Sequence, residues 1–126
     1  MRSLIFKIIK QITNILLKFK LSRFIFFAIF EEVSNFKTKV VNTRNINEEF
    51  YFYTPNYLSR YRAKSLYSKE PDTIEWLNNF KNDSIFFDIG SNVGLYSIYA
   101  AKIKNSKVYS FEPSVFNLDL LAKNVY

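Results

Sequence analysis

Both glycines of this 126-residue chain lie in one short loop, residues 88–94, whose sequence is DIGSNVG. Glycine adopts backbone angles, and permits close approaches of other groups, that a Cβ atom forbids. A chain whose whole glycine supply falls in a single loop therefore needs such a conformation there. The loop follows an apolar run and precedes a helical pattern, so the sequence predicts a strand, a tight turn and a helix in that order.

The segments on either side of the loop extend this pattern. Residues 84–89 are predicted to form a short buried strand, because β-branched and aromatic residues follow the polar stretch 81–83. Residues 93–103 show mostly helical spacing of apolar side chains, and lysines stand at the expected carboxyl end. A second strand over 107–111 and a second helix over 117–126 follow. The order predicts the first half of a nucleotide-binding βαβ unit.

Two acidic residues indicate the kind of nucleotide. Glu112 ends the second strand, 22 residues after Gly90, where nucleotide-binding units place an acid that accepts hydrogen bonds from ribose hydroxyls. Asp88 ends the first strand, where its charge would repel a pyrophosphate but suits an ammonium group. S-adenosyl-L-methionine has an ammonium and no phosphate, and its carboxylate suits backbone N–H groups at the start of the next helix.

Two other interpretations of the loop remain open at this stage. In the first, Gly90 and Gly94 only let a strand turn into a helix, and Asp88 and Glu112 are solvated strand ends. In the second, the unit is an NAD(P)-binding Rossmann domain. Two residues argue against it: Asn92 stands where the G-x-G-x-x-G loop of dinucleotide binders has its middle glycine, and the charge of Asp88 would repel a pyrophosphate.

The residues of this region resemble the FkbM family of class I S-adenosylmethionine-dependent methyltransferases. The resemblance lies in residues 87–97 (FDIGSNVGLYS), 108–113 (VYSFEP) and 117–124, and extends upstream to residues 69–77. It implies an α/β, Rossmann-like fold and O-methylation of a hydroxyl on a sugar or secondary-metabolite intermediate. The residues predicted to bind the cofactor are Asp88, Gly90, Ser91, Asn92, Gly94 and Glu112.

The same resemblance implies a larger sheet than these residues supply. We therefore expect a Rossmann-like fold truncated after its second strand and the following helix, with an open sheet edge and an uncovered apolar face. The expected organisation is a basic helical extension over 1–33, a strand and helix region over 34–83, and the start of the methyltransferase domain over 84–126. The catalytic residues would lie elsewhere, and this segment alone would be inactive.

The composition excludes several kinds of chemistry. The chain has no cysteine and no histidine, so it can form no disulfide, thiol nucleophile or common zinc site, and it offers no histidine as a general base. Transfer of a methyl group to a hydroxyl needs a base within hydrogen-bond reach of that hydroxyl. The sequence does not identify this base.

The net charge of +7 is concentrated at the amino terminus. Residues 1–30 hold six basic residues and no acid, and apolar residues recur there at helical spacing. Such a cationic amphipathic helix suits an anionic membrane surface, or it docks on a catalytic domain or a second subunit. Its longest apolar run, residues 24–30, is too short to span a bilayer. We expect a cytoplasmic location, with peripheral contact at the inner membrane surface under the first alternative, and no nucleic-acid partner.

The stretch between these ends gives weaker signals. Residues 50–53 are predicted to form a strand that ends in a turn at 54–56. Residues 57–67 are basic and aromatic, and they either cover the cofactor or its acceptor or form a solvated helix or loop. Pro71 is predicted to start a short helix whose apolar side chains include core positions.

Overall fold

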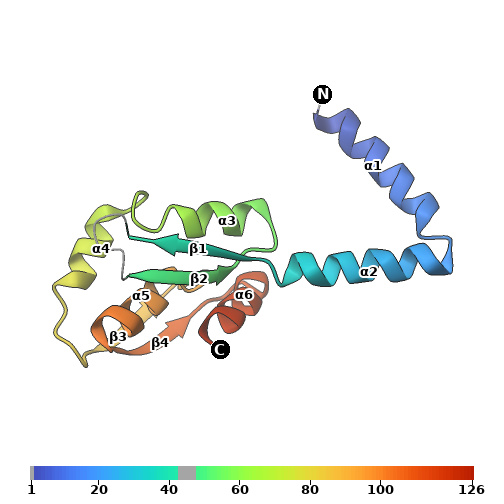
Figure 1. Ribbon diagram of the computed structural model, residues 1–126. Coiled ribbons are helices and arrows are strands. Elements are labelled where there is room, and N and C mark those ends of the chain that lie inside the picture. The colour runs from blue at the N-terminus through green and yellow to red at the C-terminus, as the bar shows by residue number, and fades with distance from the viewer. Residues whose placement is uncertain (1, 43–47) are drawn as a thin grey trace. The chain divides into compact units, whose positions relative to one another are not determined.

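The computed structural model describes residues 2–42 and 48–126. This part of the chain is α/β, with six helices and two separate two-stranded sheets (Figure 1). The backbone contacts divide it into two units, Met1–Asn35 and Phe36–Tyr126. Each unit is described by itself below.

The first unit consists of helices α1 (Arg2–Leu16) and α2 (Lys20–Ser34). The sequence predicts a helix that continues to Phe19, but the structure ends α1 at Leu16 and places Phe19 in an extended conformation before α2. The Ser22 hydroxyl donates to the carbonyl groups of Leu16 and Phe19, so the carbonyl of the last residue of the first helix accepts a hydrogen bond from beyond the break. No helix in the described part of the chain is both long enough and apolar enough to cross a membrane.

The second unit begins with an antiparallel hairpin. Strand β1 (Lys37–Val41) pairs with β2 (Glu49–Tyr53), with Lys37 opposite Tyr53 and Val41 opposite Glu49. Side chains alternate between buried and exposed along both strands, as expected for a sheet with one covered face. The strand predicted at 50–53 is confirmed, whereas its partner β1 has no counterpart in the prediction, because its lysines mask the short apolar pattern.

Two short helices follow the hairpin. Helix α3 (Tyr57–Lys64) is capped by the Asn56 side chain, which accepts a hydrogen bond from the Ser59 N–H at 2.9 Å. Helix α4 (Pro71–Asn78) begins at the predicted proline. The prediction of core residues in α4 is confirmed for Ile74 and Leu77, which are buried.

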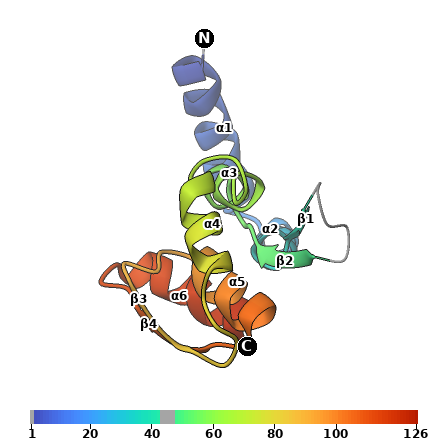
Figure 2. The same ribbon diagram turned by 90° about the vertical axis from the view of Figure 1, so that its left-hand side faces the viewer.

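The predicted strand, helix, strand and helix then appear in order. Strand β3 (Ile85–Ile89) pairs in parallel with β4 (Lys107–Phe111), and α5 (Leu95–Lys104) connects them. Helix α6 (Val115–Val125) follows β4. Helices α5 and α6 lie on the same face of this sheet, between it and the hairpin (Figures 1 and 2).

A single core joins the hairpin to the βαβ unit. The inner side chains of the hairpin, Phe50 and Phe52, are almost fully buried, and Phe50 stacks on Tyr99 of α5 with ring centroids 5.7 Å apart. Apolar side chains from α3, α4, β3 and α5 complete this cluster, including Ala63, Leu66, Ile74, Leu77, Phe86 and Ala100. The core therefore fixes the amino end of α5, next to which the glycine loop lies.

The other face of the parallel sheet is uncovered by the described residues of the second unit. Its side chains are largely apolar, and the exposed ones are Ile85, Phe87, Ile89, Tyr109 and Phe111. Phe87 stacks on Tyr109 at 5.2 Å and on Phe111 at 6.4 Å between ring centroids. The uncovered apolar face that the sequence predicts is thus present.

Helix α6 differs in detail from its prediction. The expected apolar stripe comprises Leu118, Leu121, Ala122 and Val125. Of these residues only Leu121 is buried, and Leu120, outside the stripe, is buried as well. All four residues of the stripe line a cavity between α5, β4 and α6, so the stripe faces incompletely filled space and helical spacing alone gave the wrong burial.

Candidate functional site: the glycine loop

The loop between β3 and α5 needs left-handed backbone angles. Gly90 and Gly94 have φ values of +85° and +86°, and Asn92, a residue type that tolerates this region, has +55°. The N–H groups of Gly90 and Ser91 both donate to the Phe111 carbonyl, at 2.8 and 3.0 Å. The Ser91 hydroxyl donates to the Asp88 carbonyl at 2.7 Å. These bonds tie the loop to the carboxyl ends of both parallel strands.

The two glycines serve different purposes. A Cβ atom added to Gly90 would meet no heavy atom within 4 Å, so the backbone there borders open space. A Cβ atom added to Gly94 would lie 2.6 Å from Leu121 Cδ1, because α6 packs closely against the loop at that point. Gly94 is therefore required by the packing of the protein itself. Gly90 is required only by its backbone angle, and its surroundings leave room for another molecule.

Gly94→Ala should destabilise the protein by about 1–3 kcal/mol, since alanine is strained at this φ and its methyl group displaces the buried Leu121. Urea unfolding followed by circular dichroism measures this difference. The matched variant Gly90→Ala carries the same backbone strain without the contact, so it should be less destabilised than Gly94→Ala. Equal losses in the two variants would contradict the packing role of Gly94.

Glu112 holds the loop from the end of β4. Its Oε2 accepts the Asn92 N–H at 2.8 Å, and its Oε1 accepts the Ser114 N–H at 2.9 Å and the Asn117 side-chain amide at 3.2 Å. These donors, Ser114 first, lower the pKa of Glu112 below its ordinary value of 4.5, and the charge of Arg62 lowers it further. An ionised carboxylate has about four acceptor positions. One position on Oε2 is thus left for a ligand hydroxyl.

Asp88 occupies the interior of the βαβ unit. Its side chain is buried on the helix-covered face of the sheet, and its Oδ2 accepts the Ser97 hydroxyl of α5 at 2.5 Å. Ser97 also lies 2.7 Å from the Ser110 hydroxyl of β4. The negative charge of Asp88 acts on Tyr96, whose pKa it helps to raise. The carboxylate therefore lies behind the loop, among its supporting residues.

A cavity of about 210 Å³ opens beside the loop. Its described lining comes from the loop, from the start of α5, from the last turn of α3 and from the segment between α3 and α4. It comprises Arg62, Ser65, Leu66, Lys69, Glu70, Gly90, Ser91, Asn92, Val93, Leu95 and Tyr96. Ligand sites for drug-sized molecules usually enclose about 300–1,000 Å³. This cavity is large enough for part of a nucleotide cofactor.

The cavity wall holds charges of both signs. Arg62 and Lys69 supply cations, and Glu70 supplies a carboxylate whose Oε1 lies 3.4 Å from the Lys69 Nζ. The Tyr96 hydroxyl donates to Glu70 Oε2 at 3.0 Å. Burial, followed by this hydrogen bond, raises the pKa of Tyr96 to about 12, so the phenol stays protonated at neutral pH. Such a wall is complementary to a zwitterion.

One polar atom of the loop has no partner. The side-chain oxygen of Asn92, Oδ1, is buried and accepts no hydrogen bond from the described residues. Buried polar atoms in native proteins are nearly always paired, so an orphaned acceptor calls for an explanation. Its position in a residue that lines the cavity is consistent with a donor supplied by a ligand or by water.

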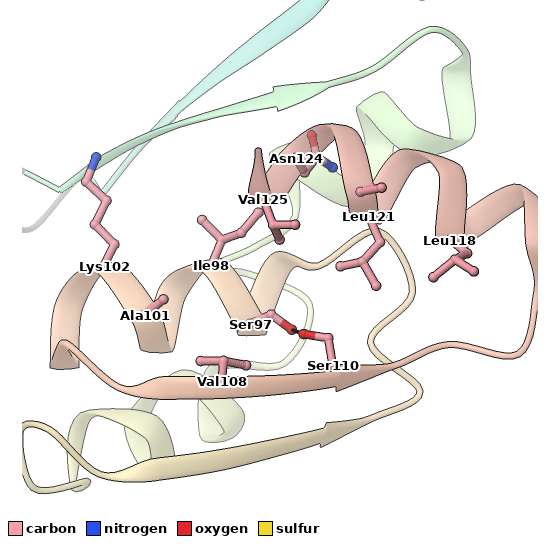
Figure 3. A pocket seen from close by; sticks show the side chains of 11 residues that line it. Ser97, Ile98, Ala101, Lys102, Val108, Ser110, Leu118, Leu121, Asn124 and Val125 are labelled. Atoms are coloured by element: carbon pink, nitrogen blue, oxygen red, sulfur yellow. Dashed lines mark hydrogen bonds between the residues drawn. The ribbon is translucent and has the colours of Figure 1, made fainter.

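A second, larger cavity of about 640 Å³ lies between α5, β4 and α6 (Figure 3). Its described lining includes no residue of the loop and is mostly apolar, with Ile98, Val108 and Leu118 among its side chains. Ser97 and Ser110 form a hydrogen bond with each other across it. With few unpaired polar groups, this cavity offers little for orienting a nucleotide, and the site is better placed at the smaller one.

The structure brings the predicted residues together in part. Gly90, Ser91 and Asn92 line the cavity, and Glu112 lies next to this lining, where its carboxylate accepts the Asn92 N–H. Gly94 and Asp88 lie in the supporting structure. Of the stretch 57–67, which is helical as far as Lys64, the residues Arg62, Ser65 and Leu66 also line the cavity.

Sequence reasoning missed three polar residues at or near the site. Tyr96 and Glu70 line the cavity together, although the residues around each of them in the sequence form no motif that indicates a binding site. Asn124 of α6 joins the loop to the hairpin, because its amide donates to the Val93 carbonyl at 2.8 Å and accepts the Tyr53 N–H at 2.7 Å. Only the fold brings these segments together.

No protein-family model, no curated protein and no solved structure matches this chain.

Proposed function

We propose that this protein binds S-adenosyl-L-methionine at the glycine loop, within a Rossmann-like methyltransferase fold. The β3–α5–β4 unit has the features of such a fold: parallel strands, a glycine turn before the helix, and an acid at the end of the second strand. The class of acceptor, a hydroxyl on a sugar or secondary-metabolite intermediate, is implied by the FkbM resemblance of residues 87–124.

The observation that carries the proposal is the open space at Gly90. At Gly94 the backbone is enclosed by protein, because a Cβ atom there would lie 2.6 Å from Leu121 Cδ1. At Gly90 nothing in the described protein lies within 4 Å of the Cβ position, and the adjoining cavity is lined by polar and charged groups. A glycine that borders an empty polar cavity permits close approach of a ligand.

The residues present suit the amino-acid end and the ribose of this cofactor. Arg62 and the N–H groups at the start of α5 suit the cofactor carboxylate, and Glu70 suits its ammonium. Glu112, with an acceptor position left on Oε2, suits a ribose hydroxyl. This assignment places Glu70 in the ammonium-binding role that the sequence predicts for Asp88, because Asp88 is engaged with Ser97 inside the unit.

When bound, S-adenosyl-L-methionine supplies an electrophilic methyl group for in-line displacement by an oxygen nucleophile. The loop and Glu112 fix the position of the cofactor, which is the main contribution that such a displacement needs from a protein. Glu70 and Tyr96 keep a polar wall on the helix side of the cavity. The described residues near the cavity do not identify the base that accepts the hydroxyl proton.

Thermal unfolding tests the choice of cofactor. S-adenosylhomocysteine, the stable product form, should raise the melting temperature in a concentration-dependent way, because a ligand that binds only the folded state stabilises it. NAD⁺ at the same concentrations should leave the melting temperature unchanged, since the Glu70 carboxylate in the cavity wall disfavours a pyrophosphate. Stabilisation by NAD⁺ alone would favour the dinucleotide alternative and contradict the proposal.

A further inference from the structure

Helix α1 has an apolar stripe that no other described residue of its unit covers. The stripe consists of Leu4, Ile5, Ile8, Ile9, Ile12, Ile15 and Leu16, and each of these side chains is at least 47% exposed. Lys7, Lys10, Gln11 and Asn14 occupy the opposite face of the same helix. Surface helices of folded domains normally turn such a stripe toward a core. Within residues 4–35, α1 has no core to face.

Helix α2 adds a second uncovered apolar surface. It contains no buried residue, and the apolar run 24–30 includes four phenylalanines, of which Phe24, Phe27 and Phe30 are more than 60% exposed. Aromatic and aliphatic side chains of this kind insert into the boundary between lipid headgroups and acyl chains. The two helices follow one another in the chain, and both expose large apolar side chains.

The charge of this unit identifies the partner that suits it. Residues 1–30 hold Arg2, Lys7, Lys10, Lys18, Lys20 and Arg23 and no acidic residue. The remaining 96 residues hold 12 basic and 11 acidic groups and are nearly neutral. Pairing of two copies through this segment would bring like charges together. An anionic surface is complementary both to the cations and to the apolar stripe beside them.

We propose that residues 2–34 bind the surface of an anionic lipid bilayer, with the α1 axis in the plane of the interface. The apolar stripe would enter the headgroup boundary, while the flexible stems of Lys7 and Lys10 let their ammonium groups reach the phosphates. A 15-residue helix is about 22 Å long, shorter than the roughly 30 Å hydrocarbon core, so it lies on the bilayer. This proposal depends only on the first unit and is independent of the proposed cofactor site.

Vesicle flotation of the full chain tests the proposal. The protein should float with vesicles of phosphatidylglycerol and phosphatidylcholine, and raising the salt from about 0.05 M to about 0.5 M should weaken association at least tenfold, because salt screens exposed charges. The double variant Ile8→Ser/Ile12→Ser should bind at least about tenfold more weakly, because two apolar side chains no longer enter the bilayer. Lys7→Gln/Lys10→Gln should weaken binding to anionic vesicles about tenfold.

Two matched variants act as controls. Gln11→Ser/Asn14→Ser makes the same number of changes on the polar face of α1, and Phe87→Ser reduces the exposed apolar surface of the parallel sheet. Both should float like the unchanged protein, to within about twofold. Absence of flotation at low salt, or equal binding to pure phosphatidylcholine at all salt concentrations, would overturn the proposal. An oligomer that Ile8→Ser/Ile12→Ser disperses, without vesicle binding, would instead identify the stripe as an interface between copies.

Discussion

Gly90→Val is expected to abolish binding of S-adenosylhomocysteine, weakening it by at least about a hundredfold, because the branched side chain enters the space beside the loop. Gly90→Ala adds a single methyl group to the same space and should weaken binding about tenfold. Neither side chain meets protein at its Cβ atom, since no heavy atom lies within 4 Å of that position. Calorimetric titration measures both affinities.

Backbone strain at Gly90 needs a control, because a side chain at φ +85° destabilises the loop regardless of any ligand. Asn105→Ala provides it. Asn105 is also in the left-handed region, with φ +52°, and ends α5 at the helix terminus opposite to the glycine loop. This variant also loses the hydrogen bond from the Asn105 side chain to Asp83, so it should lose stability in urea and keep its affinity for S-adenosylhomocysteine. Gly90→Ala with unchanged affinity would show that Gly90 serves only the turn.

Glu112→Gln should weaken binding of S-adenosylhomocysteine at least about tenfold, because a charged acceptor of ribose hydrogen bonds is replaced by a neutral one. Glu112 also holds the Asn92 N–H at 2.8 Å, so a loosened loop could produce the same loss. An analogue of the cofactor without ribose hydroxyls separates the two causes. If Glu112 contacts the ribose, the unchanged protein binds this analogue poorly and the variant binds it no worse.

An additional loss of affinity for the analogue in the Glu112→Gln variant would assign the effect to the loop alone. Asn117→Ala is the control for the hydrogen bonds around Glu112, since it removes the 3.2 Å bond from Asn117 to Glu112 Oε1 and the 3.3 Å bond from Arg62 to Asn117 Oδ1 and leaves the carboxylate in place. Its affinity for S-adenosylhomocysteine should stay within about threefold of that of the unchanged protein.

The sequence predicted the βαβ unit well because its signals are local. Apolar runs of strand length, two glycines at positive φ and lysines in the last turn of α5 all occur within about 25 consecutive residues. Helix α5 begins at Leu95, two residues after the predicted start, because Val93 is part of the loop and is buried against the core. The position of the loop beside the end of β4 follows from parallel pairing.

Features that depend on distant segments could not be predicted in this way. Strand β1 forms by pairing with β2, and Glu70 reaches the cavity through the packing of the helices around it. The residues next to each of them in the sequence predict neither position. The face of the sheet on which the Asp88 side chain lies was also not predicted. Successive side chains of a strand point to opposite faces, and Asp88 lies on the face covered by α5, where its carboxylate accepts the Ser97 hydroxyl. A strand-end acid therefore indicated the loop and left its hydrogen-bond partner unknown.

The most direct measurement is equilibrium dialysis of the full chain against tritiated S-adenosyl-L-methionine. The proposed function predicts saturable binding that unlabelled S-adenosylhomocysteine displaces and NAD⁺ does not, and that Gly90→Val abolishes while Asn105→Ala retains it. Absence of saturable binding by a protein whose circular dichroism shows the expected helices, or displacement by NAD⁺, would contradict the assignment of the glycine loop to this cofactor.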